Sequence, residues 1–80
     1  MTYTVEQTHA LLREAAVYID STGSYRVDYV EDLEEEVDGS PYCNVIMTAE
    51  EDGEQTIFDI TNIDLSEPDV HLYKLTLMNP

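Results

Sequence analysis

Acidic side chains outnumber basic ones by 18 to 3 in this chain of 80 residues, which gives a formal net charge of −15. A surface with that charge repels phosphate groups, so binding to nucleic acid or to an anionic membrane is excluded as a function. Self-repulsion also favours an unfolded chain unless enough apolar surface is buried. Leu, Ile, Val and Phe supply 20 of the 80 residues, above the roughly 20% below which highly charged chains stay disordered. We therefore expect one folded domain over residues 1–80, with a thin core.

The first third of the chain predicts a helix followed by a strand. Thr4 stands three residues before Gln7, which is the spacing of a capping box, and apolar residues then recur at helical intervals. This pattern predicts a helix over residues 5–19. Residues 20–24 are rich in Ser, Thr and Gly and predict a turn, and the alternation over residues 25–30 predicts a strand with one buried face.

The remainder predicts a second helix and three strands. A short helix is expected over residues 32–38, with an aspartate as its N-cap and a glycine just after its end. Three stretches rich in β-branched and aromatic residues predict strands at 42–49, 55–61 and 70–77, the first two joined as a hairpin through 50–54. The predicted fold class is α+β: an antiparallel sheet of four or five strands with two helices packed on one face.

Few residues offer catalytic or metal-binding chemistry. His9 and His71 are the only histidines, and no cysteine spacing around them suggests zinc. Cys43 lies in an apolar stretch without a basic neighbour to form a thiolate, and the acidic turn at residues 50–54 lacks the ligand spacing of an EF-hand. We expect no catalytic residue, no metal site and no cofactor, so the protein is not expected to be an enzyme.

The compartment is indicated by the single cysteine, which excludes an internal disulfide and favours the cytoplasm. The first residues have neither a basic flank nor an apolar run, and no stretch approaches the ~18 apolar residues of a membrane span. We expect a cytoplasmic monomer that has no contact with membranes.

Seven acids and no Lys or Arg lie between Asp28 and Asp38. On a helix, the Asp32–Glu36 and Glu34–Asp38 pairs would place like charges four residues apart, each unfavourable by roughly 0.2–0.5 kcal/mol. At ~1.5 Å per helical residue, the six carboxylates from Glu31 to Asp38 would span roughly 10 Å, near the one charge per ~1.7 Å of a DNA duplex. The density indicates imitation of a phosphate backbone.

Two plainer explanations of the acidity remain open. A charge run is most often a solvated face, and a chain with one lysine can be adapted to high salt. Salt adaptation would spread its acids, whereas 11 of the 18 lie within residues 28–38 and 50–54. This clustering argues mildly against it.

One octapeptide and the order of elements around it match a known pattern. The octapeptide Val30-Glu31-Asp32-Leu33-Glu34-Glu35-Glu36-Val37 leads from a strand into an acidic segment ahead of an antiparallel sheet. In both respects the chain resembles the uracil-DNA glycosylase inhibitors, small acidic phage-type proteins that imitate DNA. That family typically has Ser and Ile where this chain has Asp32 and Leu33.

The resemblance implies an inhibitor that binds the DNA-binding groove of uracil-DNA glycosylase, in the host cytoplasm if the chain is phage-encoded, and blocks uracil excision. Glu31 and Asp32 would meet the amides and polar side chains that normally receive phosphate, with Glu34 and Glu35 adding contacts. The partner-binding residues expected on this basis are Asp28, Glu31, Asp32, Leu33, Glu34, Glu35, Val37, Met47 and Phe58.

The resemblance also implies an apolar pocket that captures the side chain which the glycosylase wedges into DNA during base flipping. The candidate lining residues are Leu33, Val37, Val45, Met47, Phe58 and Ile60. The alternative is that these residues form the core, which suits most of them better. Met47 is the strongest candidate for the pocket because a flexible thioether adapts to a foreign side chain.

Two further functions remain open beside inhibition of this glycosylase. One is a DNA mimic directed at another DNA-binding protein, such as a nuclease, a restriction enzyme or a CRISPR effector. The other is a small acidic, halophilic interaction domain with no DNA-related partner.

Overall fold

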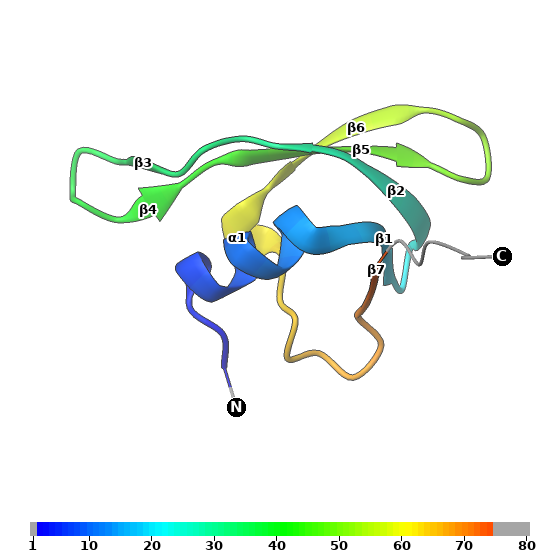
Figure 1. The fold of residues 1–80 in the computed structure, drawn as a ribbon, viewed down its shortest axis with the longest axis horizontal. Coiled ribbons are helices and arrows are strands. Elements are labelled where there is room, and N and C mark those ends of the chain that lie inside the picture. Colours follow the sequence, from blue (N-terminus) through cyan, green and yellow to red (C-terminus); the bar gives the residue numbers. More distant parts are fainter. Residues whose placement is uncertain (1, 75–80) are drawn as a thin grey trace, which may run out of the picture.

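The computed structural model describes residues 2–74 as one α-helix packed on an antiparallel sheet (Figure 1). The sheet has five strands in the order β6-β5-β2-β1-β7, and β3 and β4 form a separate two-stranded hairpin. The elements are α1 (Val5–Glu14), β1 (Ala15–Asp20), β2 (Gly23–Val30), β3 (Glu34–Glu35), β4 (Pro41–Tyr42), β5 (Asn44–Ala49), β6 (Gln55–Asp59), the 3-10 turn η1 (Ile60–Asn62) and β7 (His71–Lys74). The α+β class and the antiparallel sheet are confirmed.

The first helix begins where the sequence predicts and ends earlier. Both hydrogen bonds of the capping box between Thr4 and Gln7 are present. The helix stops at Glu14 instead of residue 19, and Ala15 already has an extended backbone with φ −87° and ψ 144°. Residues 15–20 form β1 because they pair with β2 on one side and β7 on the other. Pairing on both sides satisfies the backbone N–H and C=O groups that the helix would otherwise have paired, so the strand forms without leaving them unbonded.

The second predicted helix, over residues 32–38, is wrong. These residues belong to the β3–β4 hairpin, so the described residues hold one α-helix where two were expected. Its turn is closed by a backbone hydrogen bond from Glu36 N–H to the Ser40 carbonyl at 2.8 Å, and Gly39 has a φ of +85° that suits glycine. An extended backbone sends successive side chains to opposite faces, which separates carboxylates that a helix would stack at four-residue spacing.

The three later strands are confirmed in part. β5 and β6 are joined as a hairpin through residues 50–54, as predicted. Residues 60 and 61 lie in η1 instead of continuing β6. β7 covers His71–Lys74, and the predicted extension over 75–77 lies outside the described residues.

The core lies between α1 and one face of the sheet, and it is small. Leu12 of α1, Met47 and Val45 of β5 and Ile60 of η1 are at most 1% exposed. The remaining buried apolar residues are Tyr18, Val30, Cys43 and Ile63. No helix packs on the opposite face of the sheet within residues 2–74, so that face is open.

Candidate functional site

The eight aspartates are mostly bonded within the protein. In four places an Asp-x-Ser/Thr sequence forms a turn in which the carboxylate accepts hydrogen bonds from the backbone N–H and the hydroxyl two residues later. The N···O distances of the backbone bonds lie between 2.8 and 3.0 Å. These turns begin at Asp20, Asp38, Asp59 and Asp64, and Asp52 accepts from the Glu54 N–H at 2.9 Å.

The turn bonds lower the pKa of several of these aspartates. For Asp38 and Asp64, the hydroxyl of the following serine has the largest effect and its backbone N–H the next. For Asp20, burial raises the pKa, but the hydrogen bonds from Thr22, Tyr18 and Gly23 together outweigh burial and the net pKa is lowered. These carboxylates are therefore ionised parts of the fold.

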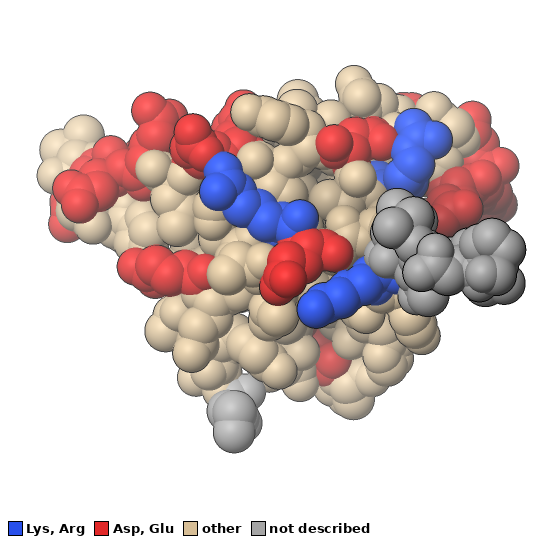
Figure 2. All heavy atoms as spheres, viewed as in Figure 1, with Lys and Arg blue, Asp and Glu red and all other residues tan. Residues whose placement is uncertain are grey.

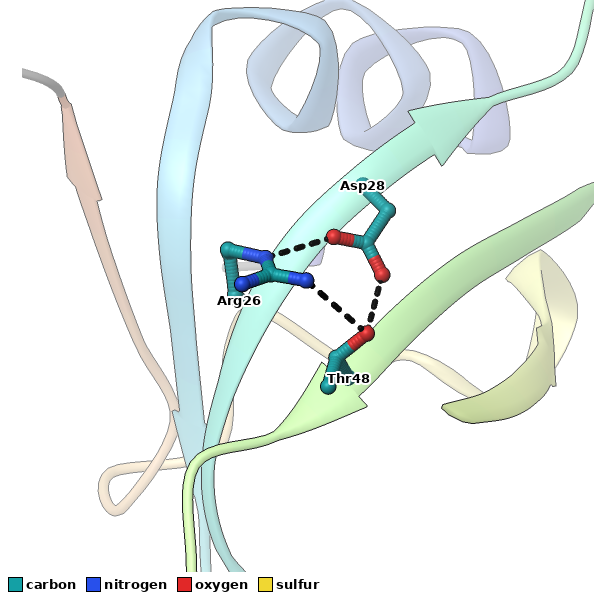
Figure 3. Close-up of polar contacts among 3 residues, drawn as sticks. All are labelled: Arg26, Asp28 and Thr48. Atoms are coloured by element: carbon teal, nitrogen blue, oxygen red, sulfur yellow. Dashed lines mark hydrogen bonds and ion pairs between the residues drawn. The ribbon is translucent and has the colours of Figure 1, made fainter. Parts of the chain in front are cut away.

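Each of the three basic side chains is paired with an acid. Arg13 of α1 binds Asp32, and Lys74 Nζ lies 3.7 Å from Glu14 Oε1. On β2, Arg26 Nε donates to Asp28 Oδ1 at 2.7 Å, and Thr48 of β5 donates its hydroxyl to the other oxygen of Asp28 (Figure 3). The hydroxyl bond from Thr48 and the bond from Arg26 lower the pKa of Asp28, in that order. With these pairs and the turns, seven of the eight aspartates have a partner, all but Asp69.

The glutamates behave differently. Only two of the ten have a partner among residues 2–74: Glu14, through Lys74, and Glu31, whose carboxylate accepts the Asn44 N–H at 3.0 Å. The other eight, here called the free glutamates, are Glu6, Glu34, Glu35, Glu36, Glu50, Glu51, Glu54 and Glu67. Six of them lie in the β3–β4 and β5–β6 hairpins. Figures 1 and 2 place these hairpins, with acidic side chains over both, at opposite ends of a molecule 47 Å long.

The acidic arm, residues 31–44, includes the β3–β4 hairpin, and helix α1 fixes its root. His9 Nε2 lies 2.8 Å from the carbonyl oxygen of Glu31 and donates to it as the Nε2–H tautomer. One helical turn further, Arg13 binds Asp32. The Glu31 N–H also donates to the Asn44 carbonyl at 3.2 Å, so β2 and β5 stay paired where the arm leaves the sheet. Glu31 and Asp32 therefore hold the arm, and the carboxylates left for a partner are those of Glu34, Glu35 and Glu36.

The extended arm changes the charge spacing that the sequence suggests. At ~3.3 Å per residue, the eight residues from Glu31 to Asp38 span at most about 23 Å, not the ~10 Å of a helix. Their six carboxylates are then at most about 4.6 Å apart on average along the arm. This spacing is nearer to the ~3.4 Å per phosphate along one DNA strand than to the ~1.7 Å of a duplex.

Five of the six candidate pocket residues lie in or against the core, and Val37 lies apart from them. Val45, Met47 and Ile60 are at most 1% exposed and belong to the core. Phe58 packs edge-to-face on Tyr18 and Tyr25, with ring centroids 5.7 and 5.1 Å apart. Leu33 packs partly buried against the core, whereas Val37 in the turn of the arm is fully exposed. The geometry favours the core alternative, including for Met47.

The lone cysteine has the environment of a core residue. Cys43 is 1% exposed, and burial, followed by the charges of Glu31 and Asp59, raises the pKa of its thiol. A raised pKa keeps the thiol protonated and unreactive at neutral pH. Within residues 2–74, no three His, Cys, Asp or Glu side chains gather as a set of metal ligands.

Comparisons of the chain with protein-family models, curated proteins and solved structures find no match. Across residues 2–74, the structure has no helix with the length and hydropathy needed to cross a membrane.

Proposed function

We propose that this protein is a DNA mimic that inhibits a DNA-processing enzyme by occupying its DNA-binding groove. The observation that carries the proposal is the contrast between the two acids: seven of eight aspartates are bonded within the protein, whereas eight of ten glutamates have no partner among residues 2–74. Six of the free glutamates lie in the two hairpins at the ends of the long axis. Fold stability does not require these six, because unpaired like charges in proximity oppose folding.

The spacing of the arm supports the same function. Glu34, Glu35 and Glu36 follow one another at about 3.3 Å per residue along the arm, so their carboxylates can meet phosphate-binding amides and cationic side chains along a groove. Opposite charge also steers the two proteins together, which raises the association rate.

The first target to test is uracil-DNA glycosylase. The chain resembles that enzyme's inhibitors in having a first helix, a strand that leads into an acidic segment, and an antiparallel sheet. The acidic segment is a hairpin in this protein where the family has a helix. We therefore assign the contacts to Glu34, Glu35 and Glu36 of the arm, with Glu31 and Asp32 maintaining its geometry. Asp28 is bonded to Arg26 and Thr48 within the sheet.

The test is a titration of the purified protein into a uracil-excision assay, with restriction cleavage and Cas9 cleavage assays in parallel. We expect uracil release to stop near one equivalent of protein. A polyglutamate of equal charge is the control for nonspecific polyanion effects and should not inhibit at that ratio. Inhibition of only a nuclease would keep DNA mimicry and change the target, whereas full activity of all three enzymes at large excess would disprove the proposal.

Salt adaptation makes an opposite prediction about folding. A halophilic surface needs molar salt to fold, whereas a mimic with this core should fold in dilute buffer. Circular dichroism at low and high salt separates the two. A chain that is unstructured until molar salt is added would favour adaptation.

A further inference from the structure

An apolar row crosses three strands on the open face of the sheet. Tyr29 of β2 pairs with Ile46 of β5, which pairs in turn with Ile57 of β6. The neighbouring pairs Val30–Val45 and Val45–Phe58 face α1 and the core. Because side chains alternate between the faces of a sheet, the row Tyr29–Ile46–Ile57 lies on the face turned away from the helix.

This row is exposed although its residues are large and apolar. Tyr29 is 59% exposed and Ile57 is 66% exposed, and Ile46 between them is half-buried. Tyr29 also lines a hollow beside Arg13 of α1, and both Tyr29 and Ile57 remain more than half exposed. Single exposed apolar residues are ordinary, but three in register across adjacent strands make a continuous patch, which commonly marks a protein contact.

Polar rows border the patch on both sides. On one side Arg26, Asp28 and Thr48 bond to one another, so the charge of the arginine is already compensated (Figure 3). On the other side Asn44 pairs with Asp59. Beyond these rows lie the two hairpins that carry six free glutamates. The patch is thus an apolar centre within a negatively charged surface.

We propose that the row Tyr29–Ile46–Ile57 binds an apolar patch in the basic DNA-binding groove of the inhibited enzyme. This proposal rests on the proposed function and adds an apolar contact between the inhibitor and the enzyme. Charge complementarity selects this occupant, because a partner that covers the row must also lie beside the glutamates. A second copy of the chain would bring another −15 charge to the same place, so self-association is opposed. The row then contributes mainly to complex lifetime, while the glutamates contribute mainly to the association rate.

The experiment uses surface plasmon resonance to measure the rates of association and dissociation. The binding partner is whichever of the three enzymes (uracil-DNA glycosylase, the restriction enzyme or Cas9) the wild type inhibits. Tyr29→Ala and Ile57→Ala are compared with the matched controls Tyr3→Ala and Leu11→Ala, which remove exposed apolar side chains away from the row. We expect both row variants to dissociate about tenfold faster or more, with association nearly unchanged. The two controls should behave as the wild type, and thermal melts should show all four variants folded.

Each other result overturns the proposal in a recognisable way. Row variants with wild-type dissociation would disprove the apolar contact and leave the inhibitor function intact. Wild-type protein that sediments as a dimer, and becomes monomeric in Ile57→Ala, would show that a second copy covers the row. If the wild type inhibits none of the three enzymes, the proposed function fails and this inference fails with it.

Discussion

The two acidic hairpins carry the same kind of charge on very different supports. The β5–β6 hairpin is part of the five-stranded sheet, and its turn is fixed by backbone bonds from Ala49 to Glu54 and from Glu50 to Ser24 of β2, at 2.9 and 3.0 Å. The β3–β4 hairpin has two residues in each strand and no third strand beside it. A two-stranded hairpin alone is marginally stable in water. The arm therefore depends on its bonds to α1. Pairing within the sheet holds the β5–β6 end of the charged surface, whereas His9 and Arg13 of α1 hold the β3–β4 end.

The largest expected effect concerns β5, which belongs to the β5–β6 hairpin and follows the arm in the chain. Met47 of β5 is fully buried and pairs with Val27 and Thr56 on its two sides. Met47→Ala should lower the free energy of unfolding by about 2–5 kcal/mol, because it leaves a cavity in a small core. Val37→Ala, in the exposed turn of the arm, is the control and should leave stability unchanged. Chemical denaturation measures both, and an unchanged midpoint for Met47→Ala would restore Met47 as a pocket residue.

Neutralising one hairpin at a time tests whether both ends contact the partner. Changing Glu34, Glu35 and Glu36 together to Gln should slow association with the inhibited enzyme about tenfold at low salt and reduce its salt dependence. The same change at Glu50, Glu51 and Glu54 should have a similar effect if the long axis lies along the groove. Glu6→Gln with Glu67→Gln is the control for two free glutamates outside the hairpins. A loss confined to one triple variant would show that only that end binds.

Removing the Arg13–Asp32 ion pair should destabilise the β3–β4 hairpin and leave the β5–β6 hairpin unchanged. Arg13→Gln breaks the ion pair with Asp32, which is exposed and therefore contributes at most about 1 kcal/mol. Native-state hydrogen exchange should become faster in the arm and stay unchanged in the β5–β6 hairpin. Arg26→Gln, which breaks a pair outside the root of the arm, is the matched control. Equal protection of the arm in both variants would contradict the anchoring role.

The smallest effect is the pH dependence of the turn that closes the arm. Because the folded pKa of Asp38 is below its ordinary value, its ionised form stabilises the turn fully above the unfolded pKa near 3.9. That stabilisation is lost as the pH falls through the folded pKa. In Asp38→Asn the side chain does not titrate, so the difference in melting temperature from the wild type should be constant above about pH 4 and change below it. A difference that stays constant down to pH 2.5 would show that the carboxylate has no role in the turn.

Patterns among neighbouring residues predict most of the sheet correctly. They fail for two segments, residues 15–20 and the arm. The strand over residues 25–30 and the hairpin of β5 and β6 are confirmed, because neighbouring residues determine both. The alternation within β2 holds only in part, because a bulge between Val27 and Tyr29 leaves Tyr29 exposed and Val30 buried. The spacing of Ala15, Tyr18 and Ile19 fits a helix as well as a strand, and only pairing with β2 and β7 selects the strand. In the arm, the residue types at Asp32 and Gly39 predict a helix, but the same segment holds the turn signal Asp-x-Ser, which competes with the helix. Asp-x-Ser/Thr forms a turn at four places in this chain.

The site was predicted by composition and only partly by position. A charge count finds the acidic stretch, but it cannot separate a carboxylate that bonds its own backbone from one that faces solvent. Residue type carries part of that information, because the short side chain of Asp reaches the N–H two residues later and the longer side chain of Glu does so less readily. The anchoring of Glu31 and Asp32 by His9 and Arg13 joins residues 19 to 22 positions apart, which no local pattern reveals.

Because most aspartates bond within the fold and most glutamates do not, the net charge of the protein can change without changing its internal bonds. Replacing the eight free glutamates by glutamine would change the net charge from −15 to −7, since 15 − 8 = 7, without removing any of the side-chain bonds described above. Selection, or a designer, can therefore vary how strongly the surface attracts a basic partner in small steps while the turns and the sheet stay constant. A fold in which the same carboxylates closed the turns and faced the partner would lack that independence.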